Sequence, residues 1–84
     1  MKIRDRIFKL ERNEIEIDKC FVAITAQDIE IIRLLGQGYI LKEIAAQLRL
    51  NVRTVESHTH KIKKIFNAKS LIHVVYLCAK NNII

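Results

Sequence analysis

A polar stripe between residues 53 and 64 has the clearest potential for chemistry. At the spacing of an α-helix, the residues on this outer face are Arg53, Glu56, Ser57, His60, Lys61 and Lys64. Lysine and arginine neutralise phosphate groups, and only outward side chains of a helix can reach base edges in the DNA major groove. The stripe indicates a polyanionic partner such as double-stranded DNA. The simpler interpretation is a solvated basic helix face.

The histidines and cysteines do not suggest a metal or redox site. His58 and His60 are two residues apart, so in a helix their rings point to different faces, and no nearby ligands complete a set of four. Cys20 and Cys78 lack a short Cys-x-x-Cys spacing and should be free thiols in a reducing cytosol. We expect no metal, no cofactor and no small-molecule ligand. Without a visible nucleophile–base pair or phosphate-binding loop, we also expect no enzymatic activity.

Composition limits the size and location of the protein. A chain of 84 residues is enough for one small domain. Its net charge of +6 is uneven, because residues 24–84 carry nine Lys/Arg and four Asp/Glu, whereas residues 1–23 carry six and five. No apolar run approaches the roughly 20 residues of a membrane span, and the charged N-terminus does not resemble a signal peptide. These features predict a cytoplasmic protein that does not enter the membrane.

Local signals predict four helices after residue 24. Thr25 is a favourable N-cap, Asp28 can complete a capping box, and Gly36–Gly38 should end the first helix. Asn51 and Ser70 are favourable N-caps for the third and fourth helices. The first predicted helix begins at Ala26. The other three cover Leu41–Leu48, about Val52–Phe66 and about Ser70–Asn82. The sequence therefore predicts an all-α, four-helix domain over residues 24–84.

The first 23 residues have weaker signals. Residues 1–12 are rich in helix formers, and in residues 14–18 the apolar Ile15 and Ile17 alternate with acidic residues. This alternation is strand-like but short. We interpret residues 1–23 as an N-terminal extension made of a short helix and an extended connector.

Residues 41–66 fit a helix-turn-helix. Two helices are joined by the short turn Arg49–Asn51, and the second helix has an apolar face opposite the basic stripe. In such a motif the second helix enters the major groove, while the first crosses the backbone and braces it. The arrangement therefore gives the polar stripe a specific position against DNA.

A set of residues between Ile24 and Tyr76 forms a recognisable pattern: Ile24-Thr25, Asp28, Glu30, Ile31, Ile32, Leu34, Leu35, Gly38, Lys42-Glu43-Ile44-Ala45, Leu48, Leu50, Thr54-Val55, His58 and Ile62. With this pattern, the stretch Ile24–Tyr76 resembles the DNA-binding domain of LuxR/GerE-type transcription regulators. The resemblance implies a four-helix helix-turn-helix fold and a regulator of bacterial or phage origin. It places Glu56, Ser57 and His60 against the bases. It places Lys42, Arg53, Thr54, His58 and Lys61 against phosphates. Lys64, on the same polar stripe, is also predicted to bind a phosphate.

The chain departs from this family pattern at several positions. Where the family usually has Ser-Asn, this chain has Ile40-Leu41, and Glu56 stands where the family usually has lysine. Gln27-Asp28 replaces the usual Arg-Glu. The remaining departures are Ile65, Asn67, Ala68 and Leu71, in place of Lys, Gly, Val and Arg.

The last helix indicates a partner. Between Ser70 and Lys80 only His73 is polar, and a helix that is apolar nearly all round must be buried nearly all round. The resemblance implies a dimer contact here, and we expect Ile72, Val75, Tyr76 and Ala79 to form it. Alternatively, residues 1–23 fold back over this helix.

Two functions follow from these patterns. The first is a sequence-specific transcriptional regulator that binds DNA as a homodimer, with two half-sites about one helical turn apart. The second is an interaction protein that pairs with another regulator or with RNA polymerase and binds DNA weakly.

Overall fold

The computed structural model describes residues 14–18 and 20–84. Over these residues the chain forms two short strands followed by four helices, and the predicted all-α, four-helix fold class is confirmed with a small sheet added. The elements are β1 (Glu14–Ile17), β2 (Cys20–Ala23), α2 (Ala26–Gly36), α3 (Leu41–Leu48), α4 (Val52–Phe66) and α5 (Leu71–Lys80). The helix expected within residues 1–12 lies outside the described residues.

The helices begin where the sequence predicts. The Thr25 hydroxyl accepts from the Asp28 N–H at 3.1 Å, and the Asp28 carboxylate accepts from the Thr25 N–H at 3.2 Å, which completes the predicted capping box of α2. The Asn51 side chain accepts from the Arg53 N–H at 2.8 Å, and the Ser70 hydroxyl accepts from the His73 N–H at 3.2 Å. Each contact satisfies an N–H group that the helix leaves without an internal partner.

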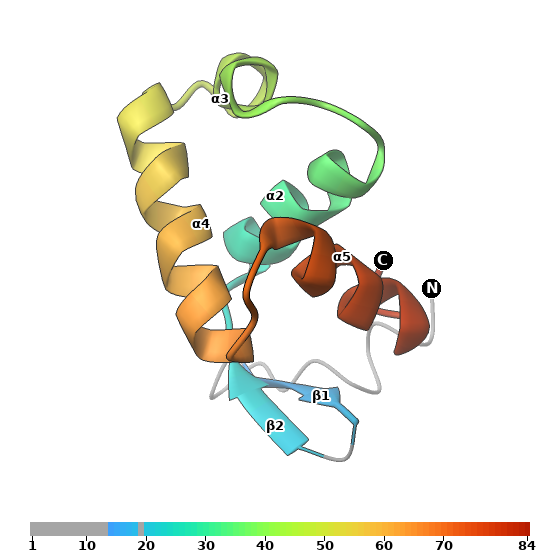
Figure 1. Ribbon diagram of the computed structural model, residues 1–84. Coiled ribbons are helices and arrows are strands. Elements are labelled where there is room, and N and C mark those ends of the chain that lie inside the picture. The colour runs from blue at the N-terminus through green and yellow to red at the C-terminus, as the bar shows by residue number, and fades with distance from the viewer. Residues whose placement is uncertain (1–13, 19) are drawn as a thin grey trace.

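Two hydrophobic clusters hold the elements together. In the first, buried residues from the strands, α2, α4 and α5 meet, including Ile15, Ile32 and Ile62. In the second, Ile31 of α2 meets Ile44 and Ala45 of α3 and Val55 of α4. Figure 1 shows α2 at the centre, α3 beyond one end of α4, and the strands beside the other end of α4. The long helix α4 therefore connects both clusters.

Strands β1 and β2 pair as an antiparallel ladder, where an extended connector was expected. Ile15 pairs with Val22 and Ile17 pairs with Cys20, and the side chains of both isoleucines are buried in the first cluster. At the tip, the Asp18 N–H donates to the Asn81 side-chain oxygen at 3.0 Å, just after the end of α5. The alternation of Ile15 and Ile17 is therefore a true strand pattern, stabilised by packing against distant helices.

Within the part of the chain that the structure describes, helix α5 is covered on one side only. Val74 and Cys78 are fully buried, whereas Ile72 is 82% exposed and Tyr76 is 57% exposed. Among the described residues, no helix is long and apolar enough to cross a membrane.

Candidate nucleic-acid interface

The turn between α3 and α4 fixes the relative position of the two helices. Arg49 adopts a left-handed conformation (φ 57°) at the end of α3, and the Leu50 N–H donates to the Ala45 carbonyl at 2.8 Å. Asn51 then caps α4. Leu48 and Leu50 pack against the second cluster on either side of the turn. The two helices therefore form a braced helix-turn-helix unit, as the sequence predicts.

Helix α4 separates a buried face from an exposed face. Its buried residues are Val55, Thr59, Ile62 and Phe66, at spacings of four, three and four. Its exposed residues are Val52, Arg53, Thr54, Glu56, Ser57, His60, Lys61 and Lys64. All three residues predicted to face bases are therefore on the outer surface. So are the predicted phosphate-binding residues of α4, except for the half-buried His58.

A buried carboxylate ties α4 to α2. Asp28 is fully buried, and its two carboxylate oxygens contact His58 Nδ1 at 2.7 Å and Lys61 Nζ at 2.9 Å. One of these oxygens also accepts from the Thr25 N–H. The same side chain therefore completes the cap of α2 and holds two residues of α4.

The protonation of Asp28 reflects this setting. Burial alone would raise the pKa of its carboxyl group, but hydrogen bonds from Lys61, His58 and Thr25 outweigh that effect and lower the pKa. The carboxylate is therefore charged at neutral pH. The sequence indicated Asp28 as a capping residue, but not its pairing with His58 and Lys61, which lie 30 and 33 residues later.

In the domain without DNA, this network already engages two of the residues that are predicted to bind phosphates. His58 has 21% and Lys61 has 46% of its side chain exposed, and both are already paired with Asp28. To contact a phosphate, either side chain must share or leave the carboxylate. Arg53, Thr54 and Lys64 carry no such pairing among the described residues.

The start of α3 also faces outward. Ile40 occupies the N-cap position and is 60% exposed, and Lys42 in the first turn is exposed. Glu43 accepts from the Ile40 N–H at 3.0 Å, but isoleucine has no side-chain oxygen to return the bond. Only half of a capping box is therefore present at this helix start.

The predicted dimer residues lie on the uncovered side of α5. Ile72, Tyr76 and Ala79 are exposed, and Val75 is half-buried. Ile72 and Val75 also line a shallow apolar hollow of about 190 Å³ with Leu35, Gly36 and Leu71. In the described part of the chain, no group of three or more potential metal-binding side chains comes together.

Comparison with known proteins identifies the family of this arrangement. The family model for bacterial regulatory proteins of the luxR family matches residues 22–78. The chain is 34% identical over 64 residues to the oxygen regulatory protein NreC of Staphylococcus carnosus, covering 76% of this chain and 30% of that protein. It is 32% identical over 60 residues to the tetrathionate response regulatory protein TtrR of Salmonella typhimurium, covering 71% of this chain and 29% of that protein.

The chain thus spans less than a third of the length of these curated relatives. No solved structure matches the chain at a significant level. The family match covers the helix-turn-helix and all the residues of α4 described above. The chain belongs to the luxR family of bacterial regulatory proteins, and residues 22–78 are its DNA-binding domain.

Proposed function

We propose that this chain is a sequence-specific transcriptional regulator that binds double-stranded DNA with the outer face of α4. The observation that carries the proposal is the division of α4 into a buried apolar face and a long exposed polar face. A helix presented in this way fits the major groove and can place Glu56, Ser57 and His60 beside base edges. Lys42, Arg53, Thr54 and Lys64 would contact phosphates, with His58 and Lys61 shared between phosphate and Asp28.

The relatives support a regulatory role. Their names describe an oxygen regulatory protein and a tetrathionate response regulatory protein. We propose that this chain likewise controls transcription in the cytoplasm of a bacterium, encoded by the bacterium or by a phage. It would act by binding DNA rather than by catalysing a reaction.

We further propose that the regulator acts as a homodimer through α5. Ile72 and Tyr76 are large apolar side chains on an open surface, beside a shallow apolar hollow. Pairing of two such faces would remove them from water, and a small domain gains more from this than a large one. A twofold dimer would place the two copies of α4 at half-sites about one helical turn apart.

The dimer is tested by sedimentation velocity. We expect Ile72→Glu to convert the dimer to a monomer, because it buries a charge at the centre of the interface. Ile40→Ser is the matched control, since it removes an exposed isoleucine far along the chain from α5 and should leave the dimer intact. A dimer that persists in the Ile72→Glu variant would refute the proposed interface.

DNA binding is tested by fluorescence anisotropy on random-sequence duplex DNA over a series of salt concentrations. We expect the logarithm of affinity to fall with the logarithm of salt with a slope of about −3 or steeper, because several phosphates are neutralised. Arg53→Gln should reduce the magnitude of that slope by about 0.9. Arg33→Gln, which removes a charge from α2, is the control and should leave the slope unchanged. An absence of binding even at low salt would contradict the proposal.

A second candidate function is supported by two residues. Glu56 is an exposed acid within the predicted reading face, and Ile40 is an exposed isoleucine at the start of α3. These residues suit contact with a protein, such as another regulator or RNA polymerase, better than contact with phosphate. Weak DNA binding by the isolated domain together with tight association with such a partner would favour this alternative.

A further inference from the structure

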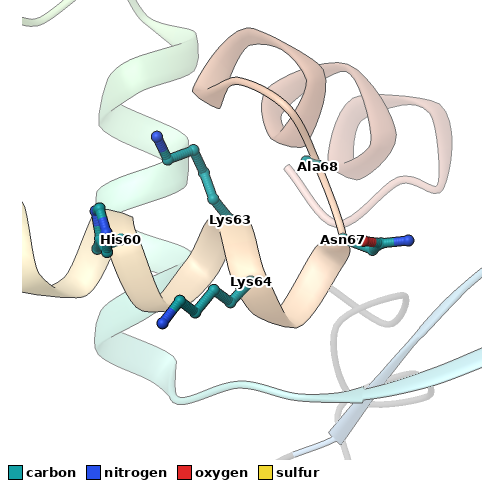
Figure 2. Close-up of a pocket in the computed structure, with 5 residues that line it drawn as sticks. All are labelled: His60, Lys63, Lys64, Asn67 and Ala68. Carbon is teal, nitrogen blue, oxygen red and sulfur yellow. The ribbon is translucent and has the colours of Figure 1, made fainter.

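A hollow of about 360 Å³ lies at the C-terminal half of α4. His60, Lys63, Lys64, Asn67 and Ala68 line it. Figure 2 shows the side chains of Lys63 and Lys64 running back along α4 with their ammonium groups on opposite sides of the ribbon, while the Asn67 amide extends the other way. The two ammonium groups are therefore the main charges of the hollow, and His60 connects it to the predicted base-facing residues.

The two lysines of this hollow have no carboxylate partner among the described residues. Residues 57–84 contain no Asp or Glu, although five lysines lie within them. Two of these lysines have carboxylate partners, since Lys61 contacts Asp28 and Lys80 contacts Asp18. Lys63 and Lys64 have no ion pair among the described residues, and Lys63 is half-buried. The hollow is therefore suited to an anion.

The length of α4 is sufficient for this hollow to reach a DNA strand in the proposed complex. Arg53 and Lys64 are eleven residues apart, which corresponds to roughly 16 Å along an α-helix. The major groove is about 12 Å wide. If α4 crosses the groove with Ser57 and His60 facing the bases, its two ends reach the groove edges, where the phosphates of opposite strands lie.

We propose that this hollow binds a phosphodiester group of the DNA strand opposite the one that Arg53 contacts, with Lys63 as an additional phosphate-binding residue. The inference rests on the proposed DNA-binding function and extends it to a second strand. Lys63 and Lys64 also stand in the last turn of α4, where cations interact favourably with the helix dipole. That role alone would affect stability but not the salt dependence of DNA binding.

The test uses Lys63→Gln and Arg53→Gln, singly and together, with Lys69→Gln as the matched control. Lys69 follows the hollow in sequence, does not line it, and carries the same charge. In the anisotropy assay, we expect Lys63→Gln to weaken binding to all sequences alike and to reduce the magnitude of the salt slope by about 0.9. In the double variant the magnitude of the salt slope should fall by about 1.8, because the two residues contact different phosphates.

Three outcomes would overturn the inference. The first is an unchanged slope in Lys63→Gln when thermal melting shows that the variant is folded. The second is an equal change in Lys69→Gln, which would mean that the hollow has no special role. The third is a double variant whose salt slope falls no further than that of Arg53→Gln alone.

Failure of the hollow can be distinguished from failure of DNA binding as a whole. If the unmodified chain fails to bind duplex DNA at low salt, the proposed function itself fails. If binding depends on salt but is unaffected by Lys63→Gln, only the proposed phosphodiester site in the hollow is refuted. Inorganic phosphate added at constant ionic strength distinguishes the source of the anion. If inorganic phosphate displaces DNA no better than chloride does, the result supports a contact between the hollow and the DNA backbone. Saturable binding of inorganic phosphate in the absence of DNA would contradict the proposal that the hollow binds a DNA phosphodiester.

Discussion

Replacing Asp28 by asparagine tests the link between α2 and α4. Asparagine has nearly the same shape, but it is neutral and one of its two carboxylate oxygens is replaced by an NH₂ donor. It can still accept hydrogen bonds at its one remaining side-chain oxygen. It cannot accept from Thr25, His58 and Lys61 as the two carboxylate oxygens now do. The variant therefore loses at least one charge-assisted hydrogen bond without creating a cavity.

The size of the effect follows from these contacts. A hydrogen bond to a charged group contributes about 1.5–3 kcal/mol. The Lys61 side chain is 46% exposed, so its share is reduced by solvent screening. We expect Asp28→Asn to lower the free energy of unfolding by about 2 kcal/mol. A domain of this size has about 4–13 kcal/mol in total, and the expected fall in Tm is about 8–16 °C.

The assay is urea unfolding followed by circular dichroism between pH 7 and pH 3. Glu30→Gln is the control, because Glu30 is an exposed acid on the same helix whose only described ion pair is at 4.0 Å. We expect this control to change stability by less than about 0.5 kcal/mol. Equal stability of Asp28→Asn and Glu30→Gln at pH 7 would refute the proposed role of the carboxylate.

The pH dependence has a definite sign. The pKa of Asp28 is lowered in the folded state, so its contribution is fully present above its ordinary value of 3.8. That contribution is lost as the pH falls through the lowered pKa. His58 and Lys61 are the titratable groups that face the carboxylate. The difference between the unmodified chain and Asp28→Asn should therefore shrink as the pH falls below 3.8.

Three other substitutions or reactions give further checks. Ile40→Ser should raise the free energy of unfolding by about 1 kcal/mol in thermal melts, because serine supplies the missing side-chain acceptor for the Glu43 N–H; a lower Tm would contradict this. Glu56→Lys should tighten binding to random duplex DNA and steepen the salt slope by up to about 0.9 in the anisotropy assay; unchanged binding would place residue 56 away from DNA. Burial raises the pKa of Cys78 to about 12, whereas Cys20 is exposed, so iodoacetamide at pH 8 should alkylate only Cys20 in the native protein and both after unfolding, as read by mass spectrometry. Rapid native modification of Cys78 would refute its burial.

The positions of the helices could be predicted because their signals are local. Thr25, Asn51 and Ser70 each cap the helix that begins at the next residue, and each makes the contact that its type predicts. The apolar spacing within α4 likewise gives its buried face. These features depend on residues a few positions apart, so the sequence carries them directly.

The hairpin and the buried carboxylate network depend on distant residues. Four residues of alternating pattern are too few to specify a strand, and β1 exists because Ile15 and Ile17 pack against helices much later in the chain. Asp28 meets His58 and Lys61 only once α2 and α4 have packed together. Local spacing places the outer residues of α4 correctly, but it does not show which of them are already paired.

The most direct test of DNA binding by α4 is NMR chemical-shift mapping of the isotope-labelled protein with duplex DNA. We predict that amide shifts concentrate at the start of α3 and along the outer face of α4, from Arg53 to Lys64. We predict little change in the hairpin at residues 14–23. Shifts confined to the hairpin and α5, with α4 unchanged, would contradict the claim that α4 binds DNA.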